Sequence, residues 1–228
     1  PSAIPASARS AQTLGSRLQR LGARHHRWAA VAAEDRMPFF PSPHRQFASA
    51  RACLFGFAAK AFAAVGATVI LHGRNVPKLE AVYDEIEAAG GAQPAILPLD
   101  FAKTSQPEID AFANAIHTAT GRLDGIFHAA SAFVSTMPLA LQDLSMWTTQ
   151  VSVNLTVPAC ITKACMPMLL RAGGASVVFL TETHAVQPKA YWGAFGVSKS
   201  ALAAMTAIWS DESEHTGVRF NLCLPSAV

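Results

Sequence analysis

Short apolar runs alternate with helix-like stretches through most of this chain, and that alternation restricts the folds open to it. Five runs have the length and composition of buried strands: Thr68–Leu71, Ala95–Leu99, Leu123–His128, Ala175–Leu180 and Val218–Leu224. Between two of them, Leu79, Val82, Tyr83 and Ile86 recur at helical spacing. Alternation of this kind predicts βαβ units with right-handed crossovers and a parallel sheet covered by helices on both faces.

The remaining helices are predicted over four stretches: 57–65, a segment with Ile109, Phe112 and Ile116 on one side, 147–170 and 200–210. The fold class is therefore α/β, a three-layer, doubly wound parallel sheet over residues 57–228. We expect the sheet to be incomplete at two places. Residues 1–56 do not join the pattern, so the first strand is missing, and the chain stops at Val228, so the C-terminal edge is short.

The composition suits one soluble domain. The chain has 228 residues, of which 51% are hydrophobic and 14% charged, as expected for a sheet buried on both faces. No run of eighteen or so apolar residues predicts a membrane span. The four cysteines show no C-x-x-C spacing, which predicts reduced thiols in a cytoplasmic protein and no metal site.

The net charge of +3 is unevenly distributed. Residues 1–56 hold eight arginines, no lysine and two acidic residues, a formal charge of +6, and the other 172 residues hold ten basic and thirteen acidic groups, a charge of −3. This basic segment lacks the folded, aromatic context of a nucleic-acid site. Three interpretations of this segment are open: an organelle transit peptide, a disordered basic arm, or translation in a wrong reading frame that ends near Gly56. We favour the last.

The stretch Phe195-Gly196-Val197-Ser198-Lys199 is the most informative motif, because it has the form Tyr-x-x-x-Lys with the tyrosine missing. A strand precedes it and a helix and a second strand follow it. Together with Asp100 at a strand end and Asn154 on the long helix, this order resembles the short-chain dehydrogenase/reductase family. The resemblance covers about residues 57–226 and implies a Rossmann-type fold. It also implies hydride transfer between a nicotinamide cofactor and a small carbonyl or alcohol, usually in a homodimer or homotetramer.

The resemblance also implies where a cofactor would bind. Arg74 follows a strand at the position that selects the cofactor, where arginine pairs with the 2′-phosphate of NADP rather than favouring NAD. His128 ends a strand in an apolar setting, and we expect it to be buried and hydrogen-bonded rather than catalytic. The full set of candidate cofactor-binding residues is Gly56, Arg74, Asp100, Phe101, Ala129, Ala130, Lys199 and Pro225.

The candidate catalytic residues include two departures from the family pattern. Asn154 matches the family's asparagine and Lys199 its lysine, whose ammonium would lower the pKa of a neighbouring tyrosine. Phe195 stands at the tyrosine and has no proton to donate. Glu182 stands at the serine. Either neighbouring threonine, Thr181 or Thr183, could offer a hydroxyl after a one-residue shift, but such a shift would turn the side chain to the other face of the strand.

The family's glycine loop is also not matched. Counting back from Gly66 places its three glycines at Ser49, Cys53 and Phe55, and the only glycine nearby is Gly56, one residue out of place. Such glycines let the backbone approach a pyrophosphate at a helix N-terminus. The family's Pro-Gly before the substrate loop corresponds to Pro225-Ser226, after which we expect the substrate lid and a last strand to be absent.

Two functions remain open from the sequence. By resemblance the chain is an NADP(H)-dependent oxidoreductase of a small carbonyl or alcohol, impaired in cofactor binding and in proton donation. The alternative is a non-catalytic scaffold or partner-binding protein that kept the sheet and lost the chemistry. We expect no nucleic-acid or membrane partner in either case.

Overall fold

Six parallel strands form one sheet in the part of the chain that the structure, a computed structural model, describes: residues 27–31 and 45–225. The strands are β1 (Arg27–Val31), β2 (Thr68–His72), β3 (Ala95–Ile96), β4 (Gly125–His128), β5 (Ser176–Leu180) and β6 (Arg219–Cys223). Their order is β3-β2-β1-β4-β5-β6, and every neighbouring pair is parallel. The direction of winding therefore reverses between β1 and β4.

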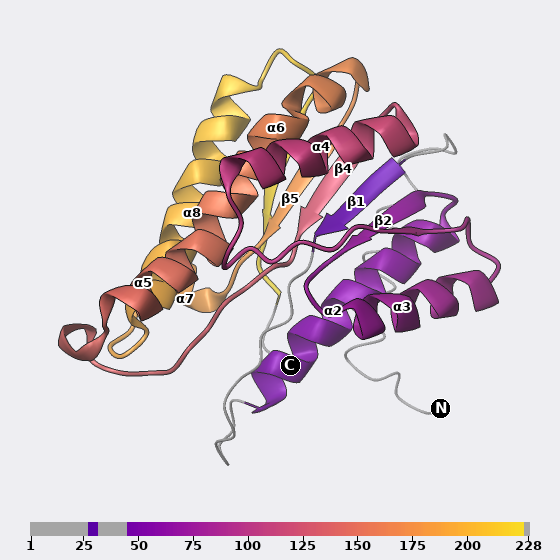
Figure 1. The fold of residues 1–228 in the computed structure, drawn as a ribbon. Coiled ribbons are helices and arrows are strands. Elements are labelled where there is room, and N and C mark those ends of the chain that lie inside the picture. The colour runs from indigo at the N-terminus through magenta and orange to yellow at the C-terminus, as the bar shows by residue number, and fades with distance from the viewer. Residues whose placement is uncertain (1–26, 32–44, 226–228) are drawn as a thin grey trace, which may run out of the picture.

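Helices cover both faces of this sheet (Figure 1). In chain order the helical elements are α2 (Arg45–Ala64), α3 (Val76–Ala88), α4 (Gln106–Thr120), η1 (Leu139–Leu141), α5 (Leu144–Val151), η2 (Ser152–Thr156), α6 (Val157–Arg171), α7 (Thr183–Val186) and α8 (Gly193–Glu212). α2 and α3 lie on one face, and α4, α6 and α8 lie on the other. The three-layer, doubly wound α/β architecture expected from the sequence is confirmed.

The two faces follow from the alternation of side chains along each strand. On β2, Val69 and Leu71 belong to the core under α2 and α3, whereas Ile70 belongs to the core under α4, α6 and α8. Phe112 of α4 and Ile161 of α6 pack in this second core. Every strand residue from Val69 to His72 is buried, which is why these runs are continuously apolar in sequence.

Local signals in the sequence set several helix ends. The side chain of Asn75 caps α3 by accepting a hydrogen bond from the backbone N–H of Lys78 at 3.2 Å. At the start of α4, Glu108 Oε2 accepts a hydrogen bond from the backbone N–H of Ser105 at 2.7 Å, as in a capping box. The same helix ends at Gly121, whose φ of 64° lies in the left-handed region that glycine adopts without strain.

The expectation that the sheet lacks its first strand is wrong. Residues Arg27–Val31 form β1, which lies between β2 and β4 and pairs with both, so that Val31 is in register with His72 and His128. The Arg-rich composition of residues 1–56 masks this strand, although Trp28–Ala33 is an apolar run of strand length. Residues 1–26, 32–44 and 226–228 lie outside the described part of the chain, so the interpretations of these segments stay untested. The shortened C-terminal edge therefore stays a prediction.

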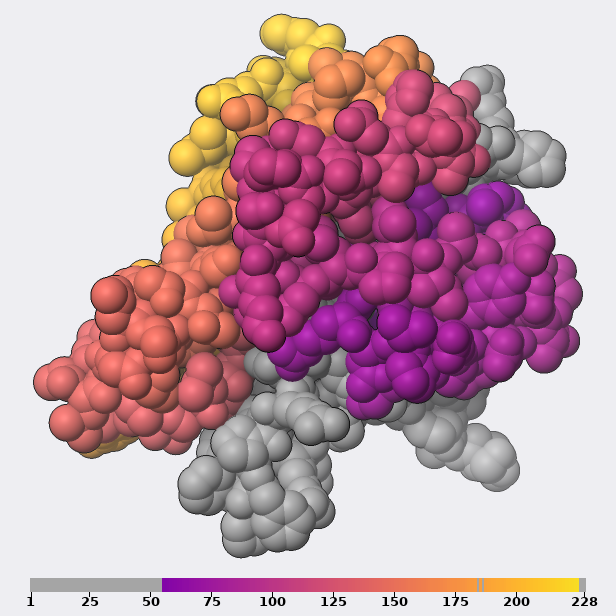
Figure 2. All heavy atoms as spheres, in the orientation of Figure 1, coloured from indigo at the N-terminus to yellow at the C-terminus, as the bar shows by residue number. Residues whose placement is uncertain are grey.

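The long helix predicted over 147–170 is divided in the structure. The helical stretch Leu144–Arg171 consists of α5, the π-helical turn η2 and α6, and the irregular turn lies just before Pro158. By length and apolar composition this stretch alone among the described helices could cross a membrane, with a mean hydropathy of 1.4 over an 18-residue window. Half of that window is buried inside the protein, as in a core helix. Its N-terminal end projects from the rest of the molecule (Figure 2).

Candidate functional site

The candidate site lies at the carboxyl ends of β1, β4 and β5, beside the point where the strand order reverses. In open α/β sheets, ligands bind at this kind of switch point, because the connections diverge there and leave a crevice. β4 ends at His128 and continues through Ala129 and Ala130, which are both buried. β5 ends at Leu180 and leads into Glu182. Thr162 of α6 contacts the end of β4, and Lys199 of α8 contacts the end of β5.

Asn154 forms hydrogen bonds both to the loop after β4 and to helix α8. It lies in the π-helical turn η2 and is 1% exposed. Its Oδ1 accepts a hydrogen bond from the backbone N–H of Ala132 at 2.6 Å, and its Nδ2 donates to the carbonyl oxygen of Ala132 at 2.9 Å. The same Nδ2 donates to Ser198 Oγ at 3.0 Å. Both amide hydrogens are thus used within the protein.

Lys199 reaches the end of β5 from the adjacent turn of α8. Its side chain is 2% exposed, and Nζ donates a hydrogen bond to the carbonyl oxygen of Leu180 at 3.3 Å. Its neighbour Ser198 donates from Oγ to the carbonyl oxygen of Phe195 at 2.9 Å. The structure therefore brings together Asn154 and Lys199, the two residues that match the family pattern, through Ser198. Sequence reasoning had assigned no role to Ser198.

Phe195 stands where the family has a proton-donating tyrosine, and its ring packs in an aromatic cluster. Its ring is 1% exposed and lies 5.2 Å from the ring of Phe133 and 5.8 Å from that of Trp192, centroid to centroid. Lys199 Nζ lies 5.9 Å from the centre of the Phe195 ring, in cation–π range. Tyr191 precedes α8, is 60% exposed and has a φ of 74°.

Glu182 and Thr183 lie where β5 passes into the short helix α7. Glu182 is the residue before α7 and is 8% exposed, so its carboxyl group is buried at the strand end. Thr183 is exposed. The buried hydroxyl of this segment belongs to Thr181, whose Oγ1 is 3.5 Å from the carbonyl oxygen of Lys199. Because Thr183 is exposed, its hydroxyl does not take the place of the family's serine in the site.

The candidate cofactor residues after β2, β3 and β6 differ in their exposure. Arg74 is exposed in the turn after β2, and Pro225 is exposed after β6. Asp100 is half-buried, and its Oδ1 accepts a hydrogen bond from the backbone N–H of Ala102 at 3.0 Å. The ring of Phe101 is 1% exposed and stacks on His72 with 4.7 Å between centroids, so that side chain belongs to the core.

Gly56 does not lie in a phosphate-binding turn. It is buried inside helix α2, eleven residues after the helix begins, and a Cβ built at this position would lie 3.4 Å from Val82 Cγ2 of α3. Gly56 thus lies in the interior of a helix that faces α3. The connection between β1 and α2 spans residues 32–44, which lie outside the described part of the chain and contain no glycine in sequence.

His128 is neutral in this setting, as expected. Its Nε2 lies 2.8 Å from Thr162 Oγ1, and its ring stacks on Phe179 with 4.8 Å between centroids. Because Thr162 donates its own hydroxyl proton to the carbonyl oxygen of Pro158, Nε2 carries the ring proton. Burial, and secondarily the nearby His72, lowers the pKa of His128 to about 3. An imidazole of this kind does not supply protons at neutral pH.

Comparison with known proteins agrees with this arrangement. A family model described as short chain dehydrogenase matches residues 55–228. The uncharacterized oxidoreductase YciK of Escherichia coli (strain K12) is 34% identical over 155 residues, which cover 68% of this chain and 62% of that protein. The aligned segment thus spans less than two thirds of that relative's length.

Solved structures with the same fold extend the likeness to most of the chain. A short chain dehydrogenase structure of Shigella flexneri complexed with NADP has a TM-score of 0.76 and 28% identity, and the likeness covers 89% of this chain and 78% of that one. A structure from Escherichia coli CFT073 complexed with NADPH has a TM-score of 0.75 and 29% identity, with the same two coverages of 89% and 78%.

Proposed function

Because the chain belongs to the short chain dehydrogenase family, we propose that it is an NADP(H)-dependent oxidoreductase that acts on a small carbonyl compound or alcohol. One observation carries this proposal. Lys199 Nζ donates a hydrogen bond to the carbonyl oxygen of Leu180 at the end of β5, and Asn154 donates one to Ser198, the residue before Lys199. A buried ammonium beside a strand end can stabilise negative charge that develops on a substrate oxygen.

The adenosine end of an NADP molecule fits the residues that follow β2 and β3. The exposed Arg74 would pair with the 2′-phosphate, and Asp100 would accept a hydrogen bond from the adenine amine, since its backbone contact with Ala102 uses only Oδ1. The described residues supply no glycine cradle for the pyrophosphate, because Gly56 packs inside α2. When bound, the cofactor would supply or accept the hydride. We therefore propose that this chain binds the cofactor weakly.

Proton transfer is the second weak point of the proposed enzyme. Phe195 offers no exchangeable proton at the position of the family's tyrosine, and loss of a positioned acid costs about 10²–10⁴ in rate. The carboxyl group of Glu182 is buried just after the end of β5, where Leu180 contacts Lys199. We assign Glu182 the role of residual proton donor, with the product alkoxide held near Lys199.

Restoring the hydroxyl group tests the proposal. Phe195→Tyr should raise the rate of NADPH oxidation across a panel of small aldehydes and ketones by about 10²–10⁴ over the wild-type chain. Phe133→Tyr is the matched control, because it adds the same hydroxyl to the adjacent ring of the cluster, 5.2 Å away between centroids. Equal rates for the two variants, or no oxidation by either, would contradict the proposed function.

A non-catalytic scaffold is the second candidate, and one observation favours it. Asn154 and Phe195 both serve packing in this chain, one by holding Ala132 and Ser198 and the other within an aromatic cluster. A scaffold should bind neither NADPH nor NADP in calorimetric titration. Family members often dimerise through the helices that correspond to α5–α6 and α8, and here Val197 and Ile208 of α8 are 46% and 58% exposed. Light scattering would distinguish a homodimer or homotetramer from a monomer.

A further inference from the structure

Helix α8, which carries Phe195 and Lys199, begins without a cap from its own sequence. The residue before the helix is Trp192, whose side chain makes no capping hydrogen bond. The N–H groups of a first helical turn need an acceptor, because no carbonyl of the same helix lies within reach. One of them finds a distant partner: the backbone N–H of Ala194 donates to Gln142 Oε1 at 2.8 Å, across 52 residues of sequence.

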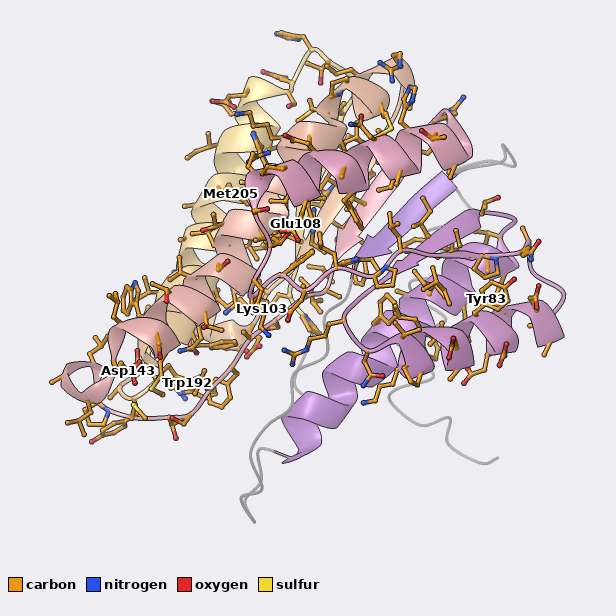
Figure 3. The ribbon with its side chains drawn as sticks, viewed as in Figure 1. Tyr83, Lys103, Glu108, Asp143, Trp192 and Met205 are labelled. Carbon is orange, nitrogen blue, oxygen red and sulfur yellow. The ribbon has the colours of Figure 1, made fainter. Side chains whose placement is uncertain are left out.

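Gln142 is the last residue of a segment that we call the strap, residues 133–142, between β4 and α5. The strap contacts the start of α8 at two further points. The backbone N–H of Met137 donates to the carbonyl oxygen of Tyr191 at 2.9 Å. At the other end of the strap, the Phe133 ring lies 5.4 Å from that of Trp192, centroid to centroid. Figure 3 shows Asp143, which follows the strap, and Trp192 at the same projecting end of the molecule.

The backbone before α8 adopts an unusual conformation where the strap contacts it. Tyr191, with a φ of 74°, is the only residue other than glycine with a positive φ among those that the structure describes. Gly193 follows with a φ of 44°, and a Cβ built on it would lie 2.0 Å from Gln142 Nε2. The glutamine therefore occupies the space that any side chain at Gly193 would need. Such conformations persist where surrounding contacts determine them.

We propose that Gln142 is a positioning residue for the site: by capping α8 from the strap, it sets where Phe195 and Lys199 lie at the ends of the strands. This inference rests on the proposed function. The Lys199–Leu180 contact at 3.3 Å lies at the long end of hydrogen-bond distances, so a small shift of α8 breaks it. A displacement of about 1 Å at a reacting group can cost about 10²-fold in rate.

The cap requires an acceptor oxygen but not an amide. Gln142 Nε2 is buried and has no hydrogen-bond partner among the described residues, so only Oε1 contributes to the cap. Gln142→Glu keeps the acceptor, removes the unpaired donor and places a negative charge at a helix N-terminus, where the helix dipole favours it. Gln142→Leu keeps the approximate shape and loses the acceptor. The two variants therefore separate capping from simple packing.

Hydrogen exchange in the full chain tests the cap without reference to activity. In Gln142→Leu, the amides of residues 194–196 should exchange at least about tenfold faster than in the wild type, because the N–H of Ala194 loses its acceptor. Gln142→Glu should exchange at the wild-type rate. Gly193→Ala should behave like Gln142→Leu, because its methyl group displaces the glutamine. Gln106→Leu is the control: it alters an exposed glutamine of α4 that bonds Asp110, and residues 194–196 should then exchange at the wild-type rate.

The same substitutions in the Phe195→Tyr background test the consequence for catalysis. Gln142→Leu should lower kcat by about 10-fold to 10²-fold, and Gln142→Glu should restore it. Unchanged exchange at residues 194–196 in Gln142→Leu, or failure of Gln142→Glu to restore it, would overturn the positioning role. A background without activity whose exchange still responds to Gln142 would overturn the oxidoreductase proposal and leave the cap standing.

Discussion

Two buried histidines make the stability of this protein sensitive to mild acid. His72 and His128 end the strands β2 and β4 and flank Val31 of β1 in register. The groups that contact their rings are neutral: the carbonyl oxygen of Leu97, the Thr162 hydroxyl, and the aromatic rings of Phe101, Phe112 and Phe179. One nitrogen of each ring is buried with no hydrogen-bond partner among the described residues. Protonation therefore places uncompensated charge in the core.

The size of the effect follows from proton linkage. Burial, opposed by the hydrogen bond to Leu97, lowers the pKa of His72 from 6.5 to about 4, and the pKa of His128 falls to about 3. Below about pH 6.5 the unfolded chain binds more protons than the folded one, so stability is lost as the pH falls. Between about pH 8 and about pH 5, each histidine lowers the free energy of unfolding by about 2 kcal/mol, and the pair by about 4 kcal/mol.

Urea titrations at the two pH values measure this loss. Wild-type protein should lose about 4 kcal/mol of unfolding free energy from about pH 8 to about pH 5, and His72→Leu or His128→Leu about half as much. The double variant should be nearly insensitive over this range. His117→Gln, at an exposed position on α4, should behave like the wild type. A double variant that loses as much stability as the wild type would refute the assignment to these two histidines.

Three further predictions concern packing, reactivity and capping. Leu169→Ala removes a fully buried side chain of α6 and should lower the free energy of unfolding by about 2–5 kcal/mol in urea; a loss below about 1 kcal/mol would contradict its burial. Burial raises the pKa of the Cys165 thiol to about 12, so intact-mass analysis should find it unmodified by iodoacetamide until the chain is unfolded. Ser105→Ala removes the first residue of the capping box of α4 and should cost about 0.5–2 kcal/mol, whereas an unchanged urea midpoint would refute the cap.

The sequence predicts the sheet well where strands are continuously apolar and poorly where they are not. Thr68–His72 and Ser176–Leu180 are rich in β-branched and aromatic residues, and both are strands at the expected places. β1 contains two alanines among its five residues and lies in an Arg-rich segment, so propensity alone gives it a weak signal. It is identified by the partners on both sides, β2 and β4, which only the folded sheet supplies.

The site divides in a similar way. Asn154 and Lys199 were found because their spacing from the strands matches a family pattern, and the structure brings them together through Ser198. Gln142 could not be found in this way, because its contact with Ala194 spans 52 residues and depends on how the strap folds back. Gly56 was misassigned because a glycine count along the chain does not distinguish a turn from close helix packing.

Calorimetric titration of the purified full chain with NADPH, and in parallel with NADH, tests the central claim most directly. We expect saturable binding of one NADPH per chain, tighter than NADH by about tenfold or more through the charge of Arg74. Arg74→Ala should remove that preference without unfolding the protein, since the side chain is exposed after β2. An absence of saturable NADPH binding at millimolar cofactor would contradict the oxidoreductase function and leave the scaffold as the better description.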